Sequence, residues 1–157
     1  MSLDSDLIVI SVTPVITTSA YTTACALGGL LSISGPNISD RLTLTSIIIL
    51  DKSNQKTAID VVLASKSIAA TANGAPIAIG AADLPNIAGV ISITTTDYVS
   101  IGTVACGTKV IASGGGIDLK GTDPGGKLYG QMIVRGTPTY VAASDLVIQF
   151  TLRVWKG

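Results

Sequence analysis

The sequence predicts an all-β protein: one antiparallel β-sandwich domain over residues 1–157, jelly-roll-like, with about eight short strands. Three observations support this prediction. β-Branched residues are frequent, and apolar residues recur mostly at every second position, which is the period of a strand. Clusters of Gly, Pro, Asn and Ser separate these runs. No helical pattern alternates with them, which argues against a parallel α/β sheet.

The two clearest strands are predicted at 128–135 and 146–155. In each, one face is apolar and the other is more polar, as a half-buried strand requires. Gly136 and Pro138 mark the connection between the two strands as a loop. The predicted core-facing residues are Leu128, Gly130, Met132 and Val134 in the first strand, and Leu146, Ile148, Phe150, Leu152 and Val154 in the second.

A third strong strand is predicted at 41–51. Strict alternation places the even-numbered residues 42–50 on one face of this strand and the odd-numbered residues 43–49 on the other. The polar segment 52–56 resembles a tight turn, and the strand pattern resumes at 57–64, so the pair is predicted to form a β-hairpin. The first face consists of Leu42, Leu44, Ser46, Ile48 and Leu50, and the second of Thr43, Thr45, Ile47 and Ile49.

Weaker patterns complete the predicted sandwich. Four further strands are expected at 7–13, 24–33, 89–93 and 108–112. A short helical turn is expected around 83–85, where Gly80 and Pro85 limit its length.

The composition argues against several classes of function. The ten acidic residues are all Asp, and the chain contains neither His nor Glu, so the commonest general bases and metal ligands are missing. We therefore predict no enzymatic activity, no cofactor and no metal. A formal net charge of zero argues against binding to nucleic acid. No apolar run approaches the ~20 residues of a membrane-spanning helix, and the acidic start of the chain is unlike a signal peptide.

The Gly-rich segment 113–127 contains a phosphate-loop pattern, Gly121 to Lys127, that we interpret as a plain loop. A phosphate loop needs Ser or Thr after its Lys, whereas Leu128 stands there, and a strand is predicted to follow instead of a helix. Asp118 and Asp123 are too few to predict a calcium site. Cys25 and Cys106 are expected to be reduced, buried apolar groups.

The surface is predicted to be partly covered by other subunits. Only 13% of the residues are charged, the mean hydropathy is +0.59 and the net charge is zero, a combination that promotes association. Aromatic residues and Arg are typical interface anchors. The predicted interface residues are Tyr140, Arg153 and Trp155, with the alternative that Trp155 packs on its own chain.

Six short segments distributed over most of the chain form a recognisable set. They are VITTSAYTTACALGGL at 15–30, LDK at 50–52, IDVVL at 59–63, AGVISI at 88–93, LYGQ at 128–131 and RGTPTY at 135–140. Together they resemble a group of small head structural proteins of tailed bacteriophages, which includes capsid cement and decoration proteins. Gly28, Gly29 and Gly130 match positions that mark the fold of this group.

This resemblance implies a β-sandwich without catalysis that forms symmetric homo-oligomers, either dimers or trimers. It implies attachment to the outer surface of a shell built by the major capsid protein, after synthesis in the cytoplasm of a bacterial host. It carries over no individual functional residue. Two alternatives stay open: a neck, tail or fibre component, and a glycan-binding jelly-roll module on the virion surface.

Overall fold

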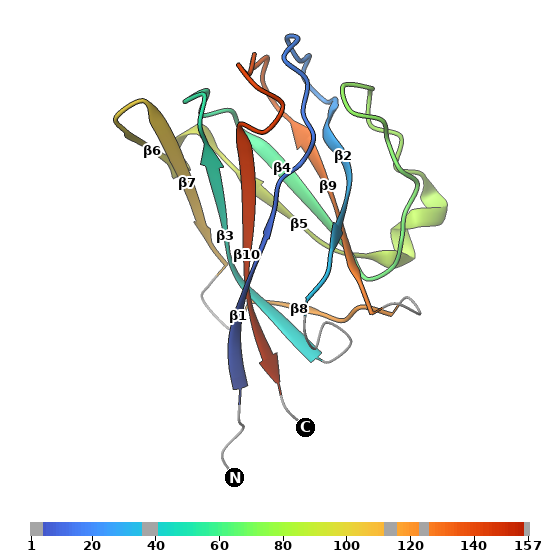
Figure 1. Cartoon of the computed structure of the whole chain (residues 1–157). Coiled ribbons are helices and arrows are strands. Elements are labelled where there is room, and N and C mark those ends of the chain that lie inside the picture. Colours follow the sequence, from blue (N-terminus) through green and yellow to red (C-terminus); the bar gives the residue numbers. More distant parts are fainter. Residues whose placement is uncertain (1–4, 36–40, 112–115, 123–125, 156–157) are drawn as a thin grey trace.

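The computed structural model describes residues 5–35, 41–111, 116–122 and 126–155. These residues form ten strands in two antiparallel sheets that pack face to face (Figure 1). The larger sheet has the order β1-β10-β3-β7-β6, with β8 also paired to β3, and the smaller sheet has the order β2-β9-β4-β5. The strands are β1 (Ser5–Val12), β2 (Ala26–Ile33), β3 (Arg41–Asp51), β4 (Ile59–Ala64), β5 (Ile87–Ile93), β6 (Tyr98–Ile101), β7 (Val104–Val110), β8 (Ile117–Leu119), β9 (Leu128–Val134) and β10 (Leu146–Trp155).

The topology is that of a jelly roll. When the short strands β6 and β8 are set aside, β1-β10-β3-β7 forms one layer and β2-β9-β4-β5 forms the other. Every pair of consecutive strands among these eight, except β4 and β5, lies in different sheets, so the chain crosses repeatedly between the layers. This arrangement is the eight-stranded jelly roll. The predicted all-β sandwich is therefore confirmed.

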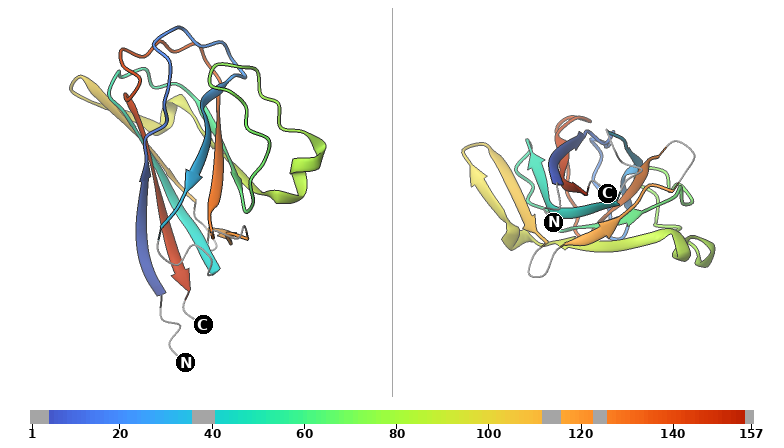
Figure 2. Two further views of the ribbon diagram at one scale, coloured as in Figure 1. Left: turned by 45° about the vertical axis from the view of Figure 1, so that its right-hand side comes forward. Right: turned by 90° about the horizontal axis from the view of Figure 1, so that it is seen from below.

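The core lies between the two sheets and follows the alternation of the sequence. On β10, all five residues predicted to face inward are at most 2% exposed. On β9, Leu128, Met132 and Val134 are likewise buried. β1 pairs with β10 along its whole length, from Ser5 opposite Trp155 to Val12 opposite Ile148, so the first and last strands lie side by side (Figure 2).

The predicted hairpin of 41–51 and 57–64 is wrong. The two segments form β3 and β4 at the expected places, but β3 pairs with β10 and β7, whereas β4 pairs with β9 and β5. The polar turn between them therefore connects the two layers. A short polar connection has the same local sequence whether it joins strands of one sheet or passes to the other, so the local pattern does not distinguish the two.

The alternation predicted for 41–51 is wrong beyond its first half, because β3 contains a β-bulge. The register with β10 shifts by one residue between Thr151 and Leu152, which leaves Thr45 of β3 as the extra residue. A shift by one residue moves every later side chain to the opposite face. As a result, the core-facing residues of β3 are Leu42, Leu44, Ile47 and Ile49, and the outward-facing residues include Ser46, Ile48 and Leu50.

Two short strands were not predicted. β6 pairs with β7 as a small hairpin, and β8 lies within the Gly-rich segment that was expected to be a loop. The Tyr98 ring of β6 packs against Gly107 of β7, where a Cβ atom would lie 2.7 Å from the ring. The weaker strands at 7–13, 24–33 and 89–93 are confirmed, and the one at 108–112 is the end of β7. The short helical turn is confirmed as a 3-10 helix at Ala81–Asn86.

Candidate interaction face

The outer face of the larger sheet carries apolar side chains that remain accessible to solvent in the described part of the chain. Five of these residues, on strands β1, β6 and β7, are between 58% and 68% exposed. The others lie on β3, β7 and β10 and are partly exposed. We call this surface the open face; it consists of Leu7, Val9, Ile48, Leu50, Val99, Ile101, Val104, Cys106, Val110 and Val147.

The strand registers arrange these residues in rows across the sheet. The longest apolar row runs from Val147 on β10 through Leu50 and Cys106 to Val99 on the edge strand β6. Directly opposite residues of an antiparallel pair have Cβ atoms about 4.5–5.5 Å apart, so this row is one continuous apolar strip. Two neighbouring rows mix apolar residues with Ser, Thr and Gln: Ser11–Gln149–Ile48–Thr108 and Val9–Thr151–Ser46–Val110. None of these three rows contains a charged residue.

The outer face of the smaller sheet differs, because its own chain covers the centre of this face. Val62, Gln131 and Ile133 point away from the core, yet they are at most 8% exposed. The segment between β4 and β5, shown in green, folds back on this side of the sandwich (Figures 1 and 2). Ile68 and Thr71 of that segment are also buried. The chain therefore shields the centre of one outer face, although Val90 on the edge strand is 55% exposed, and leaves the other outer face uncovered.

A cluster of Arg and Trp borders the open face where β10 ends. Trp155 Nε1 donates a hydrogen bond to Thr43 Oγ1 over 2.8 Å. The guanidinium carbons of Arg41 and Arg153 lie 5.9 and 5.7 Å from the centre of the indole ring, within the range of cation–π contacts. Arg41 also pairs with Asp118 at 2.8 Å. Trp155 thus packs on its own sheet and stays partly exposed beside Arg153, so both sequence-predicted surface residues border the open face.

Tyr140 requires a correction, because it is a core residue and not a surface anchor. Its side chain is only 1% exposed, and its ring meets Tyr21 edge-on with 6.1 Å between the ring centres. Burial raises the pKa of the Tyr140 hydroxyl well above its usual range. The backbone NH of Tyr21 bonds to Pro138 O, which draws the loop before Tyr140 against the sandwich. Its position in a loop had suggested exposure, but this loop folds over the end of the core.

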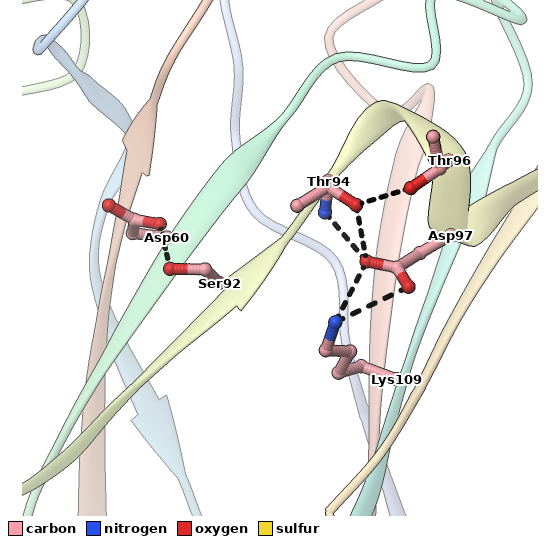
Figure 3. A network of polar contacts seen from close by, with 6 residues as sticks. All are labelled: Asp60, Ser92, Thr94, Thr96, Asp97 and Lys109. Atoms are coloured by element: carbon pink, nitrogen blue, oxygen red, sulfur yellow. Dashed lines mark hydrogen bonds and ion pairs between the residues drawn. The ribbon is translucent and has the colours of Figure 1, made fainter.

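The polar groups near β6 and β7 have a structural role. Asp97 closes the short 3-10 helix Thr95–Asp97 by accepting hydrogen bonds from the Thr94 backbone NH and hydroxyl, and it pairs with Lys109 at 3.2 Å (Figure 3). The Thr94 NH is the largest influence that lowers the pKa of Asp97. The same view shows Asp60, which accepts a hydrogen bond from Ser92 across β4 and β5.

Because of these contacts, we expect the protein to lose stability at acidic pH in part through protonation of Asp97. Because the pKa of Asp97 is lowered on folding, its contribution is complete above the unfolded value of 3.8 and is lost as the pH falls through the folded value. We expect Asp97→Asn to reduce the drop in Tm between pH 6 and about pH 2.5, measured by circular dichroism. Lys109→Gln should keep most of the drop, because the Thr94 NH remains. An unchanged drop in Asp97→Asn would contradict this.

The structure places the residues of the candidate chemical sites as follows. No group of three or more Cys or Asp side chains in residues 5–35, 41–111, 116–122 and 126–155 is placed to hold a metal ion. Leu128–Val134 is a strand, as the interpretation of the phosphate-loop pattern required. Asp123 lies outside the described residues. Cys25 is buried as expected, whereas Cys106 is partly exposed on the open face, and both are free thiols.

Comparison with known proteins gives no further assignment. No protein-family profile matches the chain, and no curated protein matches it at a significant level. Within the described residues, the chain has no helix that is long and apolar enough to span a membrane.

Sequence reasoning missed most of the open face, although a signal was present. An antiparallel strand with one solvated face should alternate between apolar and polar residues, whereas the second half of β3 is apolar on both faces. Ile47 and Ile49 fill the core, which leaves Ile48 and Leu50 on the outer face. A strand that is apolar on both faces is therefore the sequence signal of an apolar outer face.

Proposed function

We propose that this protein is a structural component of a virus particle, a capsid cement protein that binds a shell of major capsid protein through the open face. The observation that carries the proposal is the uncharged apolar strip from Val147 to Val99, left uncovered while the centre of the opposite outer face is shielded. Large exposed apolar patches on otherwise folded domains mark sites of protein contact. The resemblance to head proteins of tailed bacteriophages supplies the identity of the partner.

The energetics of the open face suit a binding role. Complete burial of a Val or Leu side chain contributes about 1.5–3 kcal/mol, and association costs on the order of 4–15 kcal/mol. A patch of this composition therefore yields a net gain only when most of it is buried together. Binding at several sites of a repeating shell raises the overall strength through avidity. A protein that acts this way needs a complementary surface and no reactive group.

The distribution of aromatic residues favours protein contact over glycan binding. Sugar-binding sites use exposed aromatic rings as platforms, but Tyr21, Tyr98, Tyr140 and Phe150 are buried. The two partly exposed rings, Tyr129 and Trp155, belong to strands of different sheets. We therefore propose the capsid shell, and not a glycan, as the partner. A neck component would lie at one vertex of the particle, and imaging of the particle distinguishes that location from the shell.

Binding to empty shells tests the proposal. The probe is a shell assembled from the major capsid protein of the phage that supplies this chain, sedimented with the purified protein. We expect the double variant Val99→Asp/Val110→Asp to bind at least about 100-fold more weakly, because burial of unpaired carboxylates costs several kcal/mol. Both residues are more than 65% exposed, so the fold should be unaffected.

The matched control places the same two charges on the other side of the sandwich. Leu84→Asp/Val90→Asp changes residues that are 63% and 55% exposed on the smaller-sheet side. This variant should bind as the unmodified protein does. Equal binding by both double variants, or no binding by the unmodified protein, would refute the proposal.

A further inference from the structure

The free edge of β1 differs from the other sheet edges. β1 spans eight residues, Ser5–Val12, and pairs only with β10 among the described strands. No backbone hydrogen bond joins β1 to a described residue outside that pair. The sequence of the strand, SDLIVISV, contains no Lys, Arg, Pro or Gly. Natural sheets usually protect an exposed edge with such residues or with an inward-pointing charge, and on β1 the only charge is Asp6, near the start of the strand.

The remaining edges are shorter, partly covered or interrupted by glycine. The edge of β2 is covered at its start by the segment 72–77, through Cys25 bridged to Pro76 and the Ala26 NH bonded to Ala75 O, and Gly28 and Gly29 interrupt the strand beyond. The edge of the larger sheet opposite β1 is β6, with only four residues. β5 also pairs with one strand only, but it is one residue shorter than β1 and is interrupted by Gly89. β1 is therefore the longest edge that the described chain leaves open without a glycine.

We propose that β1 pairs antiparallel with β1 of a second copy of this chain, and that the larger sheets of two subunits join into one across a two-fold axis. This inference does not depend on the partner of the open face. Residues 7–12 of β1 are six apolar or small residues with high β-propensity. An exposed edge of this kind promotes aggregation unless another strand pairs with it. A two-fold axis places the β1 edge of a second copy beside the β1 edge of the first, so that each edge pairs with the other.

The sequence of β1 is complementary to itself in one register. With the axis at Ile8, Leu7 lies opposite Val9 of the second copy, and Ser5 lies opposite Ser11. Leu7 and Val9 are 64% and 58% exposed in the single chain, and this register brings them into side-by-side contact at two symmetry-related places. Polar residues meet polar residues at both ends of the paired segment.

The charge pattern agrees with this arrangement. Asp6 is the acidic residue of β1, and antiparallel pairing places the two Asp6 carboxylates toward opposite ends of the interface. Like charges directly opposite each other would destabilise the pair. The side chains of Ile8, Ile10 and Val12, which pack against the core but remain partly exposed, would gain cover on the inner face.

Sedimentation of the full-length protein over a concentration series tests the dimer. We expect a monomer–dimer equilibrium that Val9→Lys shifts at least about tenfold toward monomer, because an edge Lys opposes strand pairing. Val90→Lys is the matched control, because Val90 lies on β5, an edge strand of the smaller sheet, and is 55% exposed. The proposal is overturned if the unmodified protein stays monomeric, or if Val9→Lys and Val90→Lys dimerise equally.

Disulfide trapping tests the register. Paired residues in an antiparallel ladder have Cα atoms about 4.5–5.5 Å apart, within the span of a disulfide. Under mild oxidation, Ser5→Cys/Ser11→Cys should form a cross-linked dimer, whereas each single variant should not. Efficient cross-linking of a single variant, or none of the double variant, would contradict an axis at Ile8. Because this test uses β1 alone, its result is independent of shell binding.

Discussion

Replacement of Phe150 by Ala is expected to lower the free energy of unfolding by about 3–5 kcal/mol. Phe150 is 1% exposed and lies near the middle of β10, between Ile10 on β1 and Ile47 on β3. Removal of the ring loses the free energy of burying its apolar surface. It also leaves a cavity, because pairing with β1 and β3 holds β10 in place on both sides. Urea denaturation followed by circular dichroism measures the change through the unfolding midpoint.

Two further variants keep this prediction testable, because small domains have a stability of only about 5–15 kcal/mol. Phe150→Leu should fold and lose about 1 kcal/mol, since it retains most of the apolar volume. Gln149→Ala changes the neighbouring outward-facing residue and should alter the stability by less than about 0.5 kcal/mol. A loss for Phe150→Ala no larger than that for Gln149→Ala would contradict the placement of the core.

Gly28→Ala is expected to destabilise the fold by about 2–4 kcal/mol, for two separable reasons. Gly28 has a φ of +85°, in the left-handed region where a Cβ atom costs roughly 1–2 kcal/mol. In addition, a Cβ atom at this position would overlap the Cβ of Pro14. Gly28 lies in the irregular part of β2, where the register with β9 shifts between Leu27 and Leu30. The same denaturation experiment measures the loss.

Gly74→Ala separates the two contributions. Gly74 has a similar φ of +79°, but a Cβ atom there would meet nothing within 4 Å. This variant should therefore lose only the conformational part, about 1 kcal/mol. Equal losses at both positions would show that the approach of Pro14 to Gly28 does not constrain the fold.

The strands could be predicted from the sequence because alternation is local information. On β10, apolar residues at every second position specify the buried face without reference to any other strand. The partner of each strand could not be predicted in the same way. The polar residues after β3 fit a hairpin, and only the competition of β10 and β7 for both edges of β3 sends β4 to the other sheet. Pairing between distant strands is decided by the whole core.

The open face was only partly predictable for a related reason. The bulge at Thr45 exchanges the two faces of β3, and nothing at that residue indicates that it is extra. Arg153 and Trp155 lie on the polar side of β10 as predicted, because the extra residue is on β3 and β10 keeps its alternation through Trp155. Tyr140 was misplaced because the fold of a loop over the core depends on partners such as Tyr21, more than 100 residues earlier in the chain.

Electron cryo-microscopy of intact phage particles that contain this chain tests the central claim most directly. We predict density for many copies on the outer surface of the shell, each oriented with the row from Val147 to Val99 against the major capsid protein and with the segment between β4 and β5 toward solvent. Particles that lack the chain, or copies bound with the open face exposed to solvent, would contradict the proposed function.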